Sequence, residues 1–202
     1  MFSRSIYEKF VADFITIMGP DGSAEPGEYT VLTNVRYKTV SGNKVVSKDI
    51  DVVAIPVKIG RAKPVIGLVE GDPISIDYAE KLAQQLTEGK TMHRGEEVGL
   101  GAWLEKQGFT DVDRYIYAWS FDDIQPDQVR ERLKEKGVKA FTFPELLEKL
   151  IEATWKRLDQ EGGWFEQQNH TQLIISMLLR FHKYETHGFR LDKILGRLIS
   201  KS

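Results

Sequence analysis

The chain has 202 residues, of which 41% are hydrophobic and 29% charged, and this composition excludes an intrinsically disordered protein. A formal net charge of −2 excludes a globally basic nucleic-acid-binding protein, so any such surface must be local. Cysteine is absent, which excludes disulfides and thiolate metal sites and favours a cytoplasmic protein. No apolar run reaches the roughly 20 residues that a membrane-spanning helix needs, so we expect no membrane association.

The first part of the chain is predicted to form one helix followed by three strands. Residues 3–18 repeat apolar side chains at helical spacing. Residues 29–40 and 44–57 are rich in β-branched and aromatic residues and are separated by the turn Ser41-Gly42-Asn43. Residues 64–70 form a third, short apolar strand. The short links between these strands favour antiparallel pairing.

The middle of the chain alternates between helix and strand patterns. Ser75 is a candidate N-cap for the first of these helices. A strand, a helix and a second strand over this distance indicate a parallel βαβ unit. The predicted elements are a helix over 75–88, a loop over 89–95, a helix over 96–107, a strand over 113–120, a helix over 126–136 and a strand over 138–143.

From residue 144 onward the pattern is entirely helical, with predicted helices over 144–160, 170–184 and 191–199. We therefore expect a domain of residues 1–150 followed by a helical C-terminal extension of residues 151–202. Residues 180–202 carry six Lys and Arg against two carboxylates. This basic end could contact phosphates, form a homodimer interface, or be the solvated face of two amphipathic helices.

Four carboxylates flank two apolar runs in adjacent strands. Asp49 and Asp51 open the run DVVAIPV of the second strand, and Glu70 and Asp72 close the run KPVIGLV that contains the third. Antiparallel pairing of these strands brings the four carboxylates to one end, where like charges repel unless they are protonated, solvated or bound to a cation. A hard divalent metal is one solution. The alternatives are ordinary solvent-facing strand residues for Asp49 and Asp51 and turn or cap residues for Glu70 and Asp72.

This element order, with acids on the second and third strands, resembles the core of the PD-(D/E)XK nuclease superfamily, which includes restriction endonucleases and archaeal Holliday junction resolvases. The resemblance covers residues 3–150. It implies an α/β fold with a restriction-endonuclease-like core: helix, three antiparallel strands, helix, strand, helix, strand. The family's strand-opening aspartate corresponds to Asp51, in Asp51-Val52-Val53-Ala54. The acid that ends the next strand corresponds to Glu70, and the first-helix acid of some members corresponds to Glu8.

The resemblance also implies a cofactor and a substrate. Mg²⁺ or Mn²⁺ would be held by Asp51, Glu70 and the backbone carbonyl of Gly71, and DNA would be the partner. The family's final motif is acid–any–Lys, whereas this chain has Glu70-Gly71-Asp72, so the motif lysine is missing. Some members supply the lysine from the following helix, where Lys81 is the candidate, and Gln84 or Gln85 could also face the site.

The resemblance therefore implies a metal-dependent nuclease-like protein that hydrolyses DNA phosphodiester bonds, with Asp51, Glu70, Lys81 and Glu8 as catalytic candidates. The main alternative is a catalytically inactive nuclease-fold protein that binds nucleic acid or a protein partner, because the lysine is absent at Asp72. A third alternative is a dimer or scaffold built through the C-terminal helices, with no nucleic-acid role.

Overall fold

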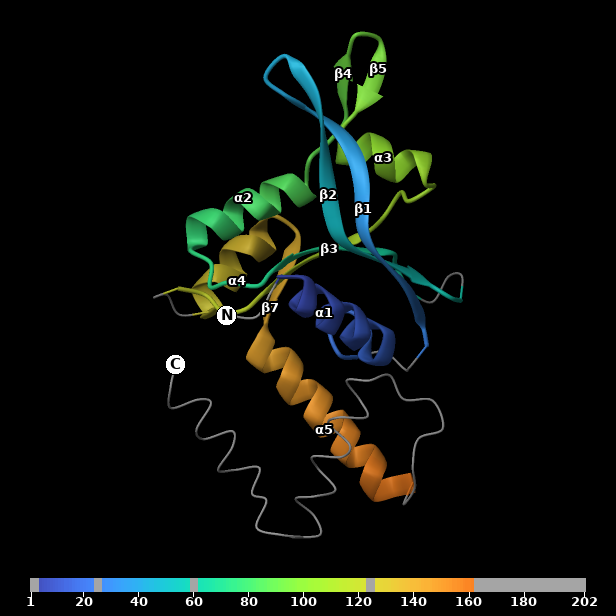
Figure 1. The fold of residues 1–202 in the computed structure, drawn as a ribbon, viewed down its shortest axis with the longest axis vertical. Helices are drawn as coiled ribbons and strands as arrows, with labels where there is room; N and C mark the ends of the chain where they lie inside the picture. Colours follow the sequence, from blue (N-terminus) through green and yellow to red (C-terminus); the bar gives the residue numbers. More distant parts are fainter. Residues whose placement is uncertain (1–3, 24–26, 59–61, 123–125, 162–202) are drawn as a thin grey trace. The chain divides into compact units, whose positions relative to one another are not determined.

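A five-stranded mixed sheet organises the first part of the chain (Figure 1). The structure is a computed structural model that describes residues 4–23, 27–58, 62–122 and 126–161, and the chain divides into two units, residues 1–147 and 148–202. The elements in chain order are α1 (Arg4–Met18), β1 (Tyr29–Ser41), β2 (Lys44–Pro56), β3 (Val65–Glu70), α2 (Ile76–Leu86), β4 (Thr91–His93), β5 (Glu96–Val98), α3 (Leu100–Lys106), β6 (Asp113–Ala118), α4 (Pro126–Glu135), β7 (Val138–Thr142) and α5 (Phe143–Glu161).

The strand order is β1-β2-β3-β6-β7. The strands β1, β2 and β3 pair antiparallel, as the short links between them predicted. The pairs β3–β6 and β6–β7 are parallel, and α4 lies between β6 and β7 in the chain, which confirms the predicted βαβ unit. The protein is therefore an α/β protein with the predicted five-stranded mixed sheet.

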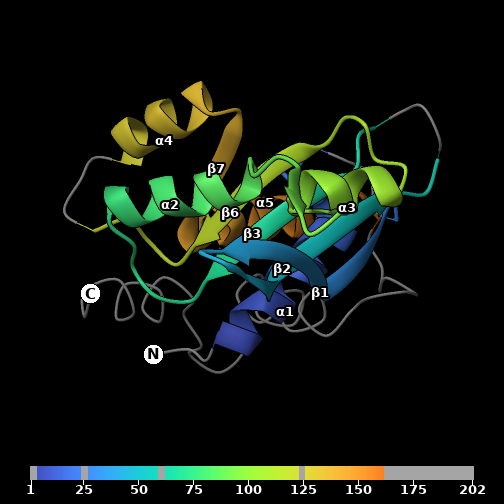
Figure 2. The ribbon, with the colours of Figure 1, turned by 90° about the horizontal axis from the view of Figure 1, so that it is seen from above.

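Helices cover both faces of the sheet, as Figure 2 shows for α1 on one face and for α2 and α4 on the other. On the α1 side, the helix buries Tyr7, Val11 and Phe14. On the opposite side, alternate residues of the central strands pack with α2, α3 and α4 in one apolar cluster that includes Ile66 and Leu68. The central strands are buried on both faces, which explains their nearly continuous apolar sequence.

The segment 89–107 was predicted wrongly. In place of a loop followed by a helix over 96–107, the chain forms the hairpin β4–β5, and the helix α3 begins only at Leu100. The two-residue turn of this hairpin is Arg94-Gly95, with φ angles of 50° and 84°. Positive φ at both positions is typical of a hairpin turn, but Arg at the first position is not the usual Asn or Asp. The sequence therefore lacks the common signal for this turn.

Two helix starts carry side-chain caps, of which the one at Ser75 was predicted from the sequence. The Ser75 hydroxyl accepts a hydrogen bond from the Tyr78 amide (3.3 Å), which confirms Ser75 as the N-cap of α2. At the start of α5, the Glu145 carboxylate accepts hydrogen bonds from the Thr142 amide (2.7 Å) and from the Thr142 hydroxyl (2.8 Å). This arrangement is one half of a capping box, in which the third helical residue reaches back to the cap residue.

Several predictions concern residues outside the described ranges. They are the helices over 170–184 and 191–199, the basic end of residues 180–202, and the homodimer interface assigned to these helices. Across the described ranges, no helix combines the length and the apolar character that crossing a membrane requires.

Candidate active site

Asp51 lies in the middle of β2 and is buried, with 1% of its surface exposed. Its Oδ2 atom accepts a hydrogen bond from the backbone amide of Val69 on β3 (2.7 Å). The paired register of β2 and β3 runs from Ala54–Val65 to Val52–Gly67 and therefore ends immediately before Asp51. The carboxylate thus accepts the hydrogen bond of a β3 amide just beyond the point where the backbone pairing stops.

The other neighbour of β2 is also irregular at this point. The β1–β2 register includes Thr33–Val52 and Val35–Ile50 but omits the intervening pair, Asn34 and Asp51. Asn34 has a φ angle of 55°, in the left-handed region that asparagine tolerates better than most residues. Interruptions of a sheet next to a buried polar residue are more frequent at functional sites than elsewhere.

Glu70 is the last residue of β3 and is partly buried. Its Oε1 atom accepts a hydrogen bond from the Tyr78 hydroxyl of α2 (3.1 Å), and its backbone carbonyl accepts one from the Trp119 amide (2.8 Å). Gly71 follows in a bend that leaves the sheet. The Glu70 carboxylate is therefore held at the strand end, next to the first turn of α2.

One face of α2 lies against β2 and β3, the two strands that carry Asp51 and Glu70. Tyr78, Lys81 and Gln85 are spaced i, i+3 and i+7, so they share this face. Tyr78 contacts Glu70, and the Gln85 Nε2 atom lies 3.4 Å from the Asp49 carbonyl oxygen of β2, a long hydrogen bond. Since the residues on either side of it contact β3 and β2, Lys81 is placed on the helical face that adjoins the strands of Glu70 and Asp51.

The side chain of Lys81 is exposed and lines an open hollow of about 480 Å³ between α2 and β2. The other lining residues are Lys48, Gln84, Gln85 and Glu88. Neither Asp51 nor Glu70 lines this hollow, and no ion pair joins Lys81 to a carboxylate of the described chain. Lys81 therefore lies on the α2 face that adjoins β2 and β3, but its ammonium group is not paired with either of the two acids.

Glu8 lies on α1 and is 9% exposed. The preceding residue, Tyr7, donates a hydrogen bond from its hydroxyl to the Ala118 carbonyl at the end of β6 (2.9 Å). Ala118 is the register partner of Glu70 in the β3–β6 pair. The part of α1 that carries Glu8 is thus fixed at the end of the sheet where β3 also ends. Burial, together with the nearby charge of Glu145, raises the pKa of Tyr7 above the usual tyrosine range.

The two remaining acids have other surroundings. Asp49 is half-exposed and forms an ion pair with Arg36 (3.3 Å), its register partner on β1. Asp72 is exposed in the bend after β3. Of the four flanking carboxylates, Asp51 and Glu70 are the two tied to consecutive residues of β3, because Asp51 accepts the hydrogen bond of the Val69 amide and Glu70 is the next residue.

The candidate metal ligands are oxygen atoms, which is the chemistry that Mg²⁺ and Mn²⁺ prefer. Asp51 and Glu70 would supply carboxylate oxygens, and Gly71 would supply a backbone carbonyl. No group of three His, Cys, Asp or Glu side chains suited to a metal ion occurs in the described part of the chain. A site with two protein carboxylates still fits Mg²⁺, because this ion commonly keeps several waters and takes further ligands from substrate phosphates.

Tyr78 and Asn34 are the two residues of this region that the sequence did not single out. Tyr78 precedes Lys81 by one helical turn, so a search of the Lys81 face of α2 could have found it. Asn34 is separated from Asp51 by 17 positions in the chain, and only the pairs on either side, Thr33–Val52 and Val35–Ile50, show that it falls at the same level of the sheet.

Comparison of the chain with protein-family models, with curated proteins and with solved structures finds no match. The function of this protein must therefore be inferred from the site itself.

Proposed function

We propose that this protein is a metal-dependent nuclease-like protein with a restriction-endonuclease-like core, and that it hydrolyses DNA phosphodiester bonds. The observation that carries the proposal is that Asp51 accepts a hydrogen bond from Val69, the residue before Glu70, while Tyr78 and Gln85 of one α2 face contact Glu70 and the Asp49 carbonyl. A buried aspartate at a sheet interruption, a strand-end glutamate and a lysine on the adjoining helical face are the residue types that metal-assisted phosphodiester hydrolysis requires.

Each group has a distinct role in this reaction. Asp51, Glu70 and the Gly71 carbonyl would hold the ion, which lowers the pKa of a bound water and stabilises negative charge on the phosphate when it is present. Water attacks phosphorus, forming one P–O bond while one P–O ester bond breaks. The attacking water loses a proton and the leaving oxygen gains one, so the products are a phosphate monoester and a free hydroxyl group.

Lys81 would supply positive charge near the scissile phosphate, the role that Asp72 cannot fill from the motif position. Its ammonium group lies on a long, flexible side chain in an open hollow. Bound DNA would bring phosphate toward this hollow, and the lysine would then reach the reacting group. Glu70, held by Tyr78, would keep its position while the substrate enters.

The direct test is a cleavage assay on branched, single-stranded and duplex DNA with Mg²⁺ or Mn²⁺. We expect Asp51→Asn and Glu70→Gln each to reduce the cleavage rate by at least about 100-fold, since each removes a metal ligand. We expect Lys81→Gln to reduce the rate by about 10- to 1000-fold, the range for loss of one group that stabilises transition-state charge.

Matched control variants separate these effects from a general change of charge. Glu131→Gln and Lys134→Gln make the same chemical changes on exposed positions of α4 and should leave cleavage unchanged. If Asp51→Asn and Glu70→Gln both cleave DNA at the wild-type rate, the site assignment is contradicted. Wild-type protein without cleavage of any of the three DNA forms would contradict the proposed reaction.

The second candidate is an inactive nuclease-fold protein that binds nucleic acid or a protein partner. The observation that favours it is that the carboxylates of Asp51 and Glu70 already hold protein hydrogen bonds, while no hydrogen bond or ion pair within the described ranges joins Lys81 to either. This candidate predicts DNA retention without turnover. Suppose that calorimetry detects Mn²⁺ binding by the wild type and loss of this binding in Asp51→Asn. That result would count against an inactive protein that binds no metal.

A further inference from the structure

A second feature lies beyond the acidic strand ends, where two hairpins are adjacent. Residues 36–48, the distal part of the β1–β2 hairpin, and residues 91–98, the β4–β5 hairpin, form what we call the two-hairpin lobe (Figure 1). The strand β1 contacts both β4 and β5. The turns of both hairpins project away from the layer formed by α2 and α4 (Figure 1).

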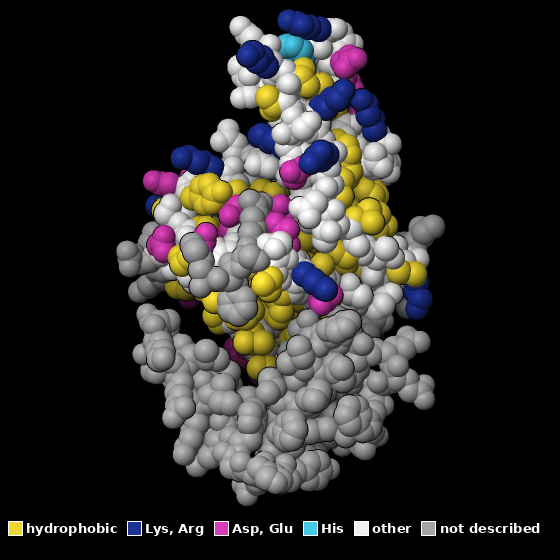
Figure 3. All heavy atoms as spheres, in the orientation of Figure 1, with side chains coloured by type: hydrophobic (Ala, Val, Ile, Leu, Met, Phe, Trp, Pro, Cys, Tyr) yellow, Lys and Arg dark blue, Asp and Glu magenta, His cyan; other side chains and the backbone are white. Residues whose placement is uncertain are grey.

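The lobe is basic in a chain that is slightly acidic overall. Residues 36–48 contain four Lys and Arg and no carboxylate. Residues 91–98 add Arg94, against Glu96 and Glu97. The lobe therefore holds five cations against two carboxylates of its own, and two of the five, Arg36 and Lys48, pair with Asp49 and Glu88 outside it. Figure 3 shows Lys and Arg side chains gathered at this end of the molecule.

Two of these cations converge from different hairpins. Lys44 and Arg94 line one open hollow of about 480 Å³, together with Asn43, Val45, His93 and Glu96. Within the described ranges, neither Lys44 nor Arg94 forms an ion pair, and the same holds for Lys38. Cations without a carboxylate partner keep their charge available for an external anion, and an Asn amide and a histidine beside them add hydrogen-bonding groups suited to phosphate oxygens.

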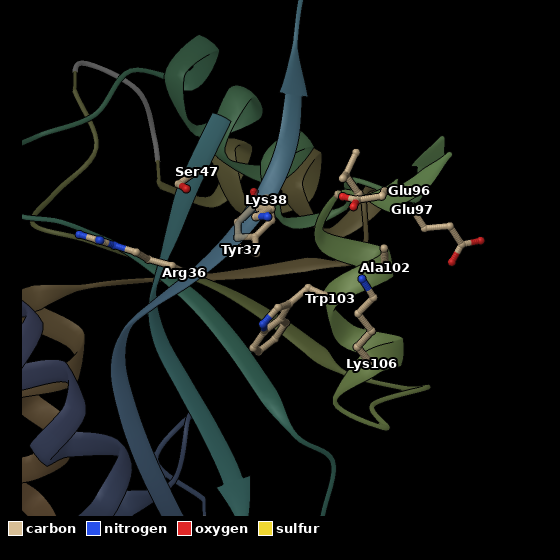
Figure 4. Close-up of a pocket in the computed structure, with 11 residues that line it drawn as sticks. Arg36, Tyr37, Lys38, Ser47, Glu96, Glu97, Ala102, Trp103 and Lys106 are labelled. Carbon is tan, nitrogen blue, oxygen red and sulfur yellow. The ribbon is translucent and has the colours of Figure 1, made fainter. Parts of the chain in front are cut away.

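Glu96 also lines a second hollow. The second hollow, of about 370 Å³, lies between β1 and α3. Figure 4 shows the Trp103 and Lys106 side chains of α3 beside Tyr37 and Lys38 of β1, whereas Arg36 points away from them. An aromatic ring with two lysines nearby is a combination that binds a nucleobase and its flanking phosphates.

The base of the lobe is held in place by the rest of the unit. The Glu88 carboxylate accepts hydrogen bonds from the Thr39 hydroxyl and from the Tyr37 hydroxyl (3.3 Å). The Gly99 amide donates to the Lys38 carbonyl (2.8 Å). Gly99 has a φ angle of 106°, and a Cβ atom there would lie 2.3 Å from the Gly89 carbonyl oxygen, so only glycine fits this junction. The lobe is thus positioned before any ligand binds, which lowers the entropy cost of binding.

We propose that the two-hairpin lobe binds the phosphate backbone of DNA, with Lys44 and Arg94 as direct phosphate contacts and Lys38 as a further contact toward the Trp103 hollow. The inference rests on the proposed action on DNA and extends it, because it assigns substrate binding to a surface separate from the metal-binding acids. An acidic protein segment is the alternative occupant.

The test measures DNA binding by the full chain in EDTA, so that no metal-dependent cleavage occurs. Fluorescence anisotropy with labelled duplex and single-stranded DNA is recorded over a range of salt concentrations. For Lys44→Gln/Arg94→Gln we expect weaker binding and a slope of log affinity against log salt that is smaller in magnitude by about two, which is about one for each cation removed from a phosphate. The control Lys9→Gln/Lys134→Gln removes the same charge from exposed positions of α1 and α4 and should keep the wild-type slope.

Folding and charge are separated by two further measurements. Thermal unfolding should show that the lobe variant is folded, and the single variant Arg94→Lys should retain most of the binding because it keeps the charge. Equal salt slopes for wild type and Lys44→Gln/Arg94→Gln would overturn the proposal, and so would an equal reduction of the slope in the control. Absence of DNA binding by the wild type would also overturn it, including the case in which the lobe binds an acidic protein instead.

The results that test the proposed nuclease activity differ from those that test DNA binding by the lobe. Lobe-dependent DNA binding without cleavage in Mg²⁺ or Mn²⁺ supports the lobe and contradicts the nuclease. Cleavage that depends on Asp51 but not on Lys44 and Arg94, with equal salt slopes for the lobe variant and wild type, supports the nuclease and contradicts the lobe.

Discussion

The Asp51 carboxylate accepts a hydrogen bond from the Val69 amide at 2.7 Å, and this contact links β2 and β3 where their backbone pairing ends. An aspartate in this position has a structural role whether or not it binds a metal. Any experiment that removes Asp51 therefore changes the sheet as well as the candidate site, and the two effects need to be measured separately.

Asp51→Ala should reduce the free energy of unfolding by about 1–3 kcal/mol, because the Val69 amide would be left buried without its acceptor. Asp51→Asn keeps a side-chain oxygen that can accept the same hydrogen bond, so without metal it should stay within about 1 kcal/mol of wild type. Denaturant unfolding in EDTA measures both variants.

The same pair of variants then separates structure from metal binding. Both should lose Mn²⁺ binding in calorimetry, because neither retains the carboxylate charge. Equal destabilisation by Asp51→Ala and Asp51→Asn would show that the Val69 contact contributes little. Wild-type Mn²⁺ affinity in Asp51→Asn would remove Asp51 from the ligand set.

Gly67→Ala should destabilise the protein by about 1–3 kcal/mol through overpacking. A Cβ atom at Gly67 would lie 3.0 Å from Cε2 of Tyr117 and 3.5 Å from the Tyr115 carbonyl oxygen. The Tyr117 ring cannot easily move, since it is fully buried, stacks on Tyr115 and Phe141, and donates its hydroxyl to the Pro20 carbonyl (2.9 Å).

Gly89→Ala is the matched control for that substitution. A Cβ atom at Gly89 meets no heavy atom within 4 Å, and Gly89 has no positive φ angle. We expect the midpoint of thermal unfolding of Gly89→Ala to equal that of wild type or to lie slightly above it, because alanine restricts the unfolded chain more than glycine does. Equal midpoints for Gly67→Ala and Gly89→Ala would contradict the tight contact with Tyr117.

Glu145→Ala should reduce the free energy of unfolding by about 1–2 kcal/mol. The carboxylate accepts hydrogen bonds from the Thr142 amide and hydroxyl and also pairs with Arg130 (2.5 Å), so the substitution removes the cap of α5 and its link to α4. The control Glu148→Ala changes an exposed carboxylate one turn further along α5. Denaturant unfolding that gives the same value for both would show that the cap has no net effect.

The sequence predicted the fold correctly where the pattern of apolar residues and turn glycines was strong. The central strands are apolar on both faces, and Gly42 marks the β1–β2 turn with a φ angle of 60°, so their positions were predicted correctly. The strands β4 and β5 have only three residues each and are mostly exposed, so they lack an alternating pattern. Their turn also depends on a positive φ angle at Arg94, which side-chain type does not indicate.

The sequence was enough to predict which acids form the candidate site, but not which residues contact them. Asp51 and Glu70 stand out because Asp51 opens one apolar run of the sequence and Glu70 closes the next. The burial of Asp51 and its hydrogen bond to Val69 depend on the register of two strands and cannot be obtained from residue type alone. The contacts of Tyr78 with Glu70 and of Gln85 with Asp49 likewise depend on how α2 crosses the sheet, and they now define which face of that helix to mutate.

The protein should lose stability at alkaline pH as the unfolded state deprotonates. Burial raises the pKa of Tyr117 and Tyr7 well above the usual value, and burial beside Glu88 raises the pKa of Tyr37. Below about pH 10 these phenols are protonated in both states, so they add no pH dependence. Above it, the unfolded chain releases protons that the folded chain retains, and each such phenol lowers the free energy of unfolding by about 1.4 kcal/mol per pH unit.

Comparison of wild type with Tyr117→Phe isolates one of these groups. At neutral pH the variant should lose about 1 kcal/mol, because the Pro20 carbonyl loses its donor. Between about pH 10 and 11.5 its stability should fall less steeply than that of wild type, because one group no longer releases a proton on unfolding. Unfolding followed by circular dichroism, with tyrosinate absorbance as a second probe, measures both slopes, and parallel curves would show that Tyr117 ionises equally in the folded and unfolded states.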